Sequence, residues 1–182
     1  MNRLIYVLPF ITLFYLGYAY FQEKTERSTP QMIERVVPYF EYPEILSKTG
    51  NNTHLSNSTL ANKPIMINIF ASWCPTCQLE HDQLMALAEM DAVDIYGIAY
   101  RDKEYMVEIM MKRDGNPYKR IALDEKGTSI HAFQARGTPQ SYIIDQNGII
   151  RYHHKGPISK KTLYSHILPA IEKVSGSGII SN

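Results

Sequence analysis

The chain has 182 residues, with 19 lysine and arginine residues against 18 aspartate and glutamate residues and a formal net charge of +1. This length suits one domain with a substantial core. The balanced charge, without a long run of one sign, leaves no electrostatic footprint for nucleic acid. Two cysteines are too few for a disulfide-framework mini-protein, so a chemical role for them is favoured.

The N-terminal segment predicts export. Residues 4–21, LIYVLPFITLFYLGYAYF, are uncharged and mostly apolar, and their length is at the lower end of what spans a bilayer. Arg3 precedes them, so the positive-inside rule places residues 1–3 in the cytoplasm and the rest of the chain on the other side of the membrane. A signal peptide cleaved after Ala19 is the alternative interpretation. Residues 22–35 are polar and are interpreted as a linker.

The domain is predicted over residues 36–174, and its first part is loop-rich. Residues 36–46 indicate one or two brief edge strands broken by Pro38 and Pro43. Residues 50–62, GNNTHLSNSTLAN, have the composition of turns, and no helix is predicted there.

The remainder of the domain alternates between strand and helix patterns. An apolar β-branched run precedes a helix, and a second strand and helix follow, which predicts a right-handed parallel βαβ unit. Asn147-Gly148 between two strand patterns predicts an antiparallel hairpin, and Pro169 is expected to kink the closing helix. The predicted strands are residues 65–70, 93–100, 121–123, 141–145 and 149–154, and the predicted helices are residues 74–90, 103–113, 129–134 and 159–174.

A parallel βαβ unit followed by a β-hairpin and a final helix, with C-x-x-C at the start of the first helix, is the thioredoxin arrangement. The predicted fold class is therefore α/β and thioredoxin-like, with a mixed central sheet flanked by helices and an N-terminal transmembrane anchor. Residues 175–182 are expected to form a flexible tail.

Cys74 and Cys77 are separated by Pro75 and Thr76, and several kinds of site use such a pair. A zinc site needs three or four ligands, and the chain has one cysteine pair only, so no metal is predicted. Haem attachment requires a histidine after the second cysteine, where this chain has Gln78. A structural disulfide across so short a loop constrains the unfolded chain little. A redox pair is the favoured interpretation.

The start of a helix gives the two sulfurs different predicted roles. Cys74 faces unpaired N–H groups at the helix N-terminus, which stabilise its thiolate, so it is predicted to be the nucleophile. Cys77, one turn into the helix and expected to be less exposed, is predicted to resolve the mixed disulfide. Trp73 is interpreted either as a shield on one side of the pair or as a core residue.

Two further features are expected at the redox pair. Glu80 falls on the helix stripe that faces the core. A partly desolvated carboxyl there has a raised pKa and can accept the proton of Cys77 when that thiol attacks; a solvated glutamate at the edge of the stripe is the alternative. Thr138-Pro139 precedes a strand and is predicted to form a cis peptide bond, which exposes the backbone of residue 138 to an extended substrate.

The segments NIFASWCPTCQLEH, GNPY, GTPQSYIID and NGIIRYHHKGPIS closely resemble the membrane-anchored thioredoxin-like reductases of cytochrome c maturation, the CcmG/DsbE family. The resemblance covers residues 36–174 and includes the N-terminal anchor. It implies a bacterial inner-membrane protein whose periplasmic domain keeps the C-x-x-C-H thiols of apocytochrome c reduced, directly or through a partner thiol protein. It also implies electrons from a DsbD/CcdA-type membrane donor, and no cofactor beyond a redox-active Cys74–Cys77 disulfide.

The same resemblance implies roles for individual residues. Cys74 matches the nucleophile, Cys77 the resolving thiol, Glu80 the acidic residue after the motif and Pro139 the cis-proline. An acidic residue commonly follows the cis-proline in this family; Gln140 keeps the hydrogen-bonding shape and loses the charge, which affects client specificity more than chemistry. The expected substrate-binding residues are Trp73, Pro75, Thr76, Thr138, Pro139 and Gln140.

Other functions compete with the dedicated cytochrome c maturation reductase. A broader exported reductase of the TlpA/ResA kind, or an oxidase or isomerase, shares every residue named above, because the direction of electron flow depends on the partners' potentials. A copper-delivery module on the same fold usually has C-x-x-x-C and a distal histidine. Here the spacing is C-x-x-C, and the candidate ligands His153 and His154 are adjacent on a predicted edge strand, where they point to opposite faces.

Overall fold

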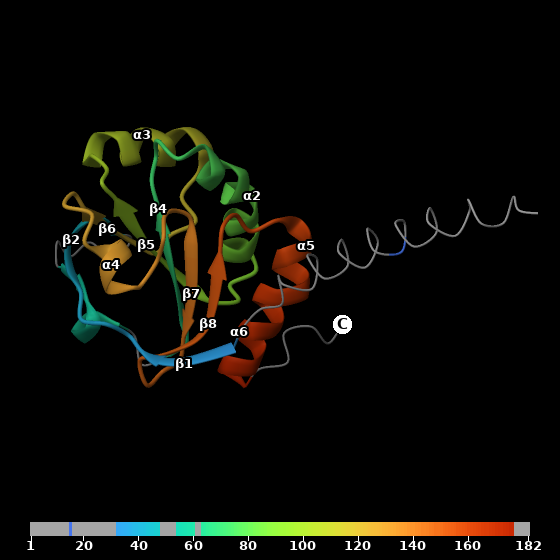
Figure 1. Cartoon of the computed structure of the whole chain (residues 1–182). Coiled ribbons are helices and arrows are strands. Elements are labelled where there is room, and N and C mark those ends of the chain that lie inside the picture. Colours follow the sequence, from blue (N-terminus) through green and yellow to red (C-terminus); the bar gives the residue numbers. More distant parts are fainter. Residues whose placement is uncertain (1–14, 16–31, 48–53, 61–62, 177–182) are drawn as a thin grey trace, which may run out of the picture. The chain divides into compact units, whose positions relative to one another are not determined.

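The computed structural model of the chain describes Tyr15 and residues 32–47, 54–60 and 63–176. The strands in these residues are β1 (Met32–Val36), β2 (Glu41–Ser47), β3 (His54–Ser56), β4 (Ile65–Phe70), β5 (Asp94–Tyr100), β6 (Arg120–Asp124), β7 (Gln140–Ile144) and β8 (Ile149–Lys155). These eight strands form one sheet in the order β1-β8-β7-β4-β5-β6-β2-β3 (Figure 1). β4, β5 and β6 run parallel, and the other neighbouring strands are antiparallel.

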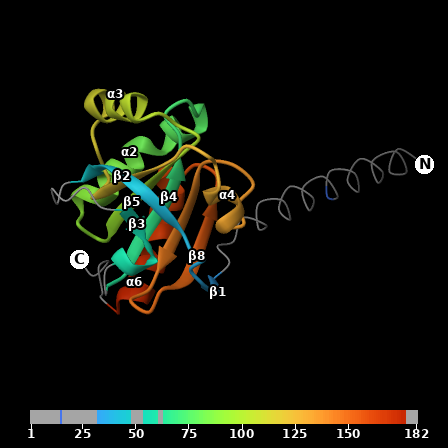
Figure 2. The ribbon, with the colours of Figure 1, turned by 90° about the vertical axis from the view of Figure 1, so that its left-hand side faces the viewer.

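Helices cover both faces of this sheet. They are α2 (Pro75–Glu89), α3 (Glu104–Asp114), α4 (Ser129–Ala132), α5 (Lys160–Thr162), the π-helical turn η2 (Leu163–Ile167) and α6 (Leu168–Ser175), with a short 3-10 turn, η1 (Asn57–Thr59), after β3. Buried residues of α2, α3, η2 and α6 share one apolar cluster on one face, and α4 contributes to a second cluster on the other face (Figure 1). In both views α3 lies at the end of the sheet where β4 leads into α2 (Figure 2).

β4 lies at the centre of the sheet and contributes to both clusters. All six of its residues are buried. Successive side chains of a strand point to opposite faces, so Met66 and Phe70 belong to the cluster under α2 and the three isoleucines belong to the other. Asn68 lies two residues from both Met66 and Phe70, so its side chain is on the same face of the sheet and points toward α2.

The elements predicted from Ile65 onward are confirmed. Their ends agree closely, and the largest difference is α4, which ends at Ala132 rather than at residue 134. The parallel βαβ unit and the antiparallel β7–β8 hairpin are both present. The interruption expected at Pro169 takes the form of η2, immediately before α6, because proline has no N–H to donate to the preceding turn.

The N-terminal part of the domain differs from the prediction in several respects. Residues 50–62, expected to form turns, contain β3 and the 3-10 turn η1, and β2 lies between β6 and β3 rather than at an edge of the sheet. Residues 32–35, assigned to the linker, belong to β1, which pairs with β8. β8 is consequently not the edge strand that was predicted. Pro43 lies inside β2 instead of breaking it. It is the last residue of β2 that pairs with β3, and the pairing of β2 with β6 begins at the next residue. A proline at the end of a pairing removes only the last donor of that ladder.

The predicted cytoplasmic segment and anchor, residues 1–21, lie outside the described residues apart from Tyr15, as does most of the predicted linker and tail. Of the helices within the described ranges, none combines the length and the apolar character needed to cross a membrane.

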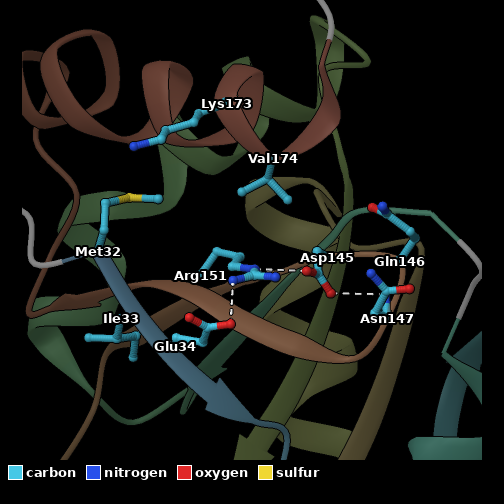
Figure 3. Close-up of a pocket in the computed structure, with 9 residues that line it drawn as sticks. All are labelled: Met32, Ile33, Glu34, Asp145, Gln146, Asn147, Arg151, Lys173 and Val174. Carbon is cyan, nitrogen blue, oxygen red and sulfur yellow. Dashed lines mark hydrogen bonds and ion pairs between the residues drawn. The ribbon is translucent and has the colours of Figure 1, made fainter.

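A pocket of about 510 Å³ lies between β1, the β7–β8 turn and the end of α6 (Figure 3). Arg151 pairs there with Glu34 at 3.0 Å and with Asp145 at 2.8 Å. Asp145 follows the last residue of β7, whereas Pro139 precedes its first residue. The pocket is thus at the opposite end of β7 from the cis-proline loop.

Candidate active site

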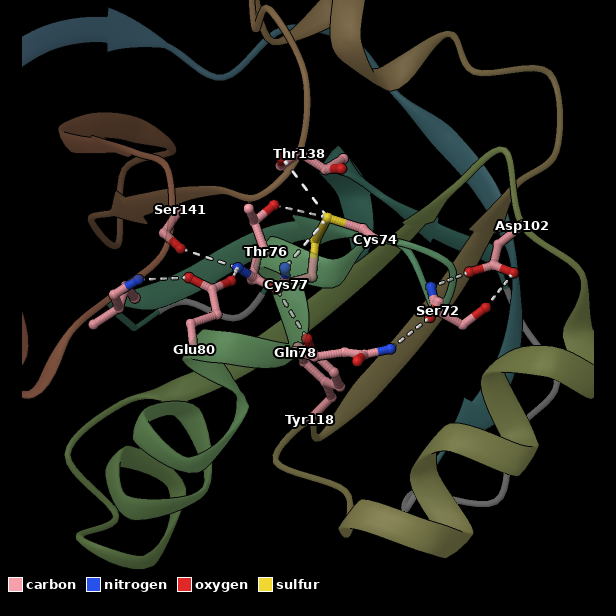
Figure 4. Close-up of a disulfide and its surroundings, with 12 residues drawn as sticks. Ser72, Cys74, Thr76, Cys77, Gln78, Glu80, Asp102, Tyr118, Thr138 and Ser141 are labelled. Atoms are coloured by element: carbon pink, nitrogen blue, oxygen red, sulfur yellow. Dashed lines mark hydrogen bonds between the residues drawn. A yellow bond between two sulfur atoms is a disulfide. The ribbon is translucent and has the colours of Figure 1, made fainter.

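Cys74 and Cys77 lie where β4 passes into α2. Cys74 is the N-cap of α2, with extended backbone angles of φ −91° and ψ 110°. Its Sγ accepts a hydrogen bond from the Cys77 backbone N–H at 3.2 Å, a first-turn donor that is shared with the Cys74 carbonyl oxygen at 3.1 Å. The two cysteines form a disulfide (Figure 4). The predicted placement of Cys74 at the helix N-terminus is confirmed.

Exposure does not distinguish the two sulfurs. Cys74 is 4% exposed and Cys77 is 3% exposed, although Cys77 was expected to be the less exposed residue. The helix cap does distinguish them, because the sulfur of Cys74 is the one that receives the N–H of the first turn. A thiolate on Cys74 would therefore be stabilised by this N–H and by the positive end of the α2 dipole.

The loop between β5 and α3 forms hydrogen bonds with Ser72 and Trp73, the two residues before Cys74. Asp102 is buried, and its carboxylate accepts hydrogen bonds from the backbone N–H of Ser72 at 2.6 Å and from the Ser72 hydroxyl at 2.8 Å. The indole N–H of Trp73 donates to the carbonyl oxygen of Arg101 at 3.1 Å, while the residue stays 53% exposed. Trp73 is a surface residue beside the pair, and its interpretation as a core residue is wrong.

The loop before β7 faces the sulfur of Cys74. The Thr138-Pro139 peptide bond is cis, as predicted. The carbonyl oxygen of Thr138 lies 3.9 Å from Cys74 Sγ, and the hydroxyl of Thr76 lies 3.2 Å from the same atom (Figure 4). Pro75 and Thr76, in the first turn of α2, are exposed. This sulfur therefore lies next to the surface residues of the first helical turn.

Gln140 follows the cis-proline as the first residue of β7, and its side chain is buried. Its Oε1 accepts a hydrogen bond from His153 Nε2 at 2.7 Å, and the His153 ring stacks on Tyr142 at 4.2 Å between centroids. Burial lowers the pKa of His153 to about 4. His154 instead approaches the carbonyl oxygen of Pro157 at 3.4 Å. The two histidines point to opposite faces, as expected from their adjacency, and a client-binding role for Gln140 stays a prediction.

Glu80 lies one helical turn beyond Cys77 on the core-facing side of α2, and its side chain has no exposed surface. Its Oε1 accepts from Asn68 Nδ2 at 2.9 Å, and its Oε2 accepts from the backbone N–H of Ile158 at 2.9 Å. Burial raises the pKa of Glu80 from 4.5 to about 7, against the lowering effect of these two hydrogen bonds. The core-facing position is confirmed, and the solvated alternative is wrong.

The structure brings together the disulfide, the cis-proline loop, Trp73 and Glu80 as the sequence predicts. Sequence reasoning missed the polar residues, four of them buried, that hold them in place. Asn68 was a visible signal, being the one amide in an otherwise apolar strand, and Asp102 follows the end of a buried strand where functional side chains often lie. The missed residues are Asn68, Ser72, Asp102, Tyr118 and Ser141.

Comparison with known proteins places this site in a family. A family model described as Redoxin matches residues 34–167. The thiol:disulfide interchange protein DsbE of Pasteurella multocida is 40% identical over 112 residues, which cover 62% of this chain and 61% of that protein. The protein of the same name from Haemophilus influenzae is 33% identical over 125 residues, covering 69% of this chain and 68% of that protein.

A secreted thiol-disulfide isomerase from Corynebacterium glutamicum shares the fold, with a TM-score of 0.64 and 15% identity over 79% of this chain and 92% of that chain. The thioredoxin-like fold predicted from the sequence is thereby confirmed, and the Cys74–Cys77 disulfide occupies the expected place in it. The chain belongs to the DsbE family of thioredoxin-like thiol:disulfide oxidoreductases, within the wider Redoxin family.

Proposed function

We propose that this protein is a reductase of cytochrome c maturation, which passes two electrons from Cys74 and Cys77 to the C-x-x-C-H disulfide of apocytochrome c or to the disulfide of a partner thiol protein. One observation supports the proposal most strongly: a fully buried carboxyl, Glu80, with a pKa of about 7, lies one turn from the resolving cysteine. Such a carboxyl suits proton transfer to and from a thiol near neutral pH.

The reaction starts from the reduced form. The Cys74 thiolate attacks one sulfur of the client disulfide, which forms a mixed disulfide and releases a client thiolate that takes up a proton. Cys77 gives its proton to Glu80 and its sulfur attacks Cys74 Sγ, which releases the second client sulfur as a thiolate. That thiolate is protonated in turn, with Glu80 as the nearby source. The client gains two electrons and two protons, and the protein is left with the Cys74–Cys77 disulfide.

The client lies over the exposed first turn of α2 and the cis-proline loop. Trp73, Pro75 and Thr76 supply contacts on one side of Cys74. The backbone of Thr138 pairs with the extended client on the other side, next to Pro139, in the manner of a strand added to a sheet edge. Gln140, the first residue of β7, completes this list of proposed contacts.

The oxidised protein is reduced again by a dithiol of a DsbD/CcdA-type membrane donor, through the same exchange in reverse. No cofactor beyond the cysteine pair takes part. Residues 4–21 anchor the chain in the bacterial inner membrane, with the catalytic domain on the periplasmic side, where a disulfide needs an active reductant to be opened.

A trapping experiment tests this function. Cys77→Ser removes the resolving sulfur, so Cys74 should remain in a mixed disulfide with its client. We expect apocytochrome c or a maturation thiol protein among the trapped partners, and Cys74→Ser serves as the matched control because it should trap nothing. A range of unrelated exported proteins, with no maturation component, would instead indicate a broader TlpA/ResA-like reductase.

The reduction potential tests the direction of electron flow. Equilibration of the full chain with glutathione and with dithiothreitol gives the potential of the Cys74–Cys77 pair. A reductase requires a potential below that of its clients, in the range of strongly reducing thioredoxin-like proteins. A potential in the range of an oxidase or isomerase would overturn the proposed direction, and tight binding of Cu(I) without disulfide exchange would favour copper delivery.

A further inference from the structure

The G-N-P-Y segment ends with a tyrosine that lies deep in the active-site face of the sheet. Tyr118 is 1% exposed, and its ring stacks on Phe70 with centroids 4.8 Å apart. Gly97 of β5 makes this possible, because a Cβ at that position would lie 2.9 Å from the Phe70 ring and 3.1 Å from the Tyr118 ring. The backbone N–H of Tyr118 also donates to the Asn116 side chain at 2.9 Å, and this hydrogen bond fixes the turn that leads into β6.

The hydroxyl of Tyr118 donates to Asn68 Oδ1 at 2.8 Å. The Asn68 amide in turn uses both hydrogens of Nδ2, one toward Glu80 Oε1 at 2.9 Å and the other toward Ser141 Oγ at 3.0 Å. Glu80, Ser141 and Tyr118 are labelled in Figure 4. Both N–H groups and the carbonyl oxygen of the Asn68 side chain thereby have a hydrogen-bond partner. The two ends of the amide are not interchangeable here, because an ionised carboxylate only accepts hydrogen bonds and the N–H end must therefore face Glu80.

We propose that Tyr118 is a positioning residue of the thiol:disulfide reaction, whose hydroxyl fixes the orientation of the Asn68 amide so that Asn68 presents an N–H to the Glu80 carboxylate. This deepens the proposed function, because it rests on Glu80 as the proton acceptor of Cys77. It also assigns a role to the G-N-P-Y segment. Tyr118, the last residue of this segment, passes Gly97 of β5 and reaches Asn68, the residue of β4 that is paired with Gly97.

The direction of the effect follows from the hydrogen bonds. Without the Tyr118 hydroxyl, Asn68 Oδ1 is left buried without a donor, and rotation of the amide by half a turn places this oxygen next to Glu80. A carbonyl oxygen repels a carboxylate and accepts a hydrogen bond from a protonated carboxyl. Loss of the hydroxyl therefore favours the protonated form of Glu80, and the carboxyl titrates at higher pH.

The other groups around Glu80 do not reverse this sign. Asn68 on β4, Ser141 on β7 and the Ile158 N–H after β8 are neutral, and His81, the next residue of α2, is directed to the carbonyl oxygen of Gly115 at 3.1 Å. The titratable groups that face Glu80 among the described residues are Tyr118 itself and, in the reduced protein, Cys77. In the oxidised protein neither titrates near neutral pH, because the disulfide has no proton and burial raises the pKa of Tyr118 well above 10.0.

The test uses the oxidised full chain labelled with ¹³C at the glutamate carboxyl carbons. The Glu80 signal is identified by its loss in Glu80→Gln, and its midpoint in the wild-type protein is expected near pH 7. In Tyr118→Phe the midpoint should rise by about one pH unit, the effect of weakening one hydrogen bond to a charged acceptor. Tyr142→Phe is the matched control, since this buried tyrosine donates to Phe133 on the other face of the sheet and should leave the midpoint unchanged.

A double-mutant cycle tests whether Tyr118 acts through Asn68. Asn68→Leu should raise the Glu80 midpoint at least as much as Tyr118→Phe, and adding Tyr118→Phe to it should cause no further rise. An unchanged or lowered midpoint in Tyr118→Phe overturns the proposal, and so does a full additional shift in the double variant, which would mean direct action on Glu80. If Tyr118→Phe does not fold, the proposal is overturned by an unchanged Glu80 midpoint in Asn68→Leu.

The titration needs neither client nor electron donor. A shift in Tyr118→Phe together with a failed trapping experiment would therefore remove the proposed client and keep the positioning role. In the reduced protein, the pH midpoint of mixed-disulfide release should move upward by the same amount in Tyr118→Phe, a change that a purely structural loss of stability would not produce.

Discussion

Replacing Glu80 by glutamine tests the central chemical assignment of the site. The substitution preserves the size of the side chain and removes its ability to ionise. Because the Glu80 pKa is about 7, the wild-type carboxyl is mostly ionised only above neutral pH, and there it disfavours a second negative charge on the nearby sulfur. The thiolate of the cysteine pair should therefore form at lower pH in Glu80→Gln than in the wild-type protein.

The size of this shift can be worked out from the helix. Residues three apart on a helix lie about 5–6 Å apart, and two charges at that separation repel by about 3 kcal/mol at an effective dielectric constant of about 20. That energy corresponds to about two pH units. Both Glu80 and Cys77 are buried, so solvent screens this repulsion little. Relaxation of the site lowers the value, and a shift of about one to two pH units is expected.

The same substitution should slow the step in which Cys77 attacks Cys74. The resolving thiol loses its proton acceptor, and general-base catalysis by one positioned group typically contributes about a hundredfold or more. The ultraviolet absorbance of the thiolate, followed against pH, measures the first effect. Single-turnover reduction of a C-x-x-C-H peptide disulfide measures the second.

Glu89→Gln is the matched control, since Glu89 is an exposed residue at the far end of the same helix and the change in net charge is identical. It should alter neither the titration nor the rate. The two expected effects of Glu80→Gln have opposite signs, because the thiolate forms more easily and the client is released more slowly. If Glu80→Gln behaves like Glu89→Gln in both assays, Glu80 is not the proton acceptor.

Three further outcomes are expected. In the reduced protein near neutral pH, Cys74 should be alkylated before Cys77, because only Cys74 caps α2; peptide mapping after a short iodoacetamide pulse identifies the site, and first labelling of Cys77 reverses the assigned roles. Asp102→Ala should lower the free energy of unfolding by about 3 kcal/mol, because it removes the carboxylate that accepts both hydrogen bonds from Ser72. Urea unfolding of the oxidised proteins measures this change, and an unchanged midpoint would mean that these hydrogen bonds do not stabilise the fold. The folded state holds the Glu80 proton more tightly than the unfolded state does, so protonation of Glu80 stabilises the fold. This contribution to the free energy of unfolding is complete below pH 4.5 and is lost as the pH rises through about 7. It amounts to about 3 kcal/mol at most, and parallel pH profiles of unfolding for wild type and Glu80→Gln would argue against it.

The sequence alone determined the order of the elements from Ile65 onward and the position of the redox pair within them. Each of these conclusions depends on a local pattern: the apolar run of β4, the proline in the first turn of α2, the Asn-Gly turn of the hairpin. Helical periodicity was also sufficient to place Glu80 on the buried face of α2. Residues close in sequence have a geometry that the backbone alone restricts to a few states, and that is why such patterns are informative.

Only the tertiary structure decided which side chains meet at the disulfide. Tyr118 reaches Asn68 across 50 positions of the chain, Ser141 reaches it across 73, and the Ile158 N–H reaches Glu80 across 78. The structure likewise decided that Trp73 stays at the surface and that the sheet begins at Met32. Strand order and register bring these residues together, and neither is encoded in the period of a single segment, since the same alternating pattern fits more than one partner strand.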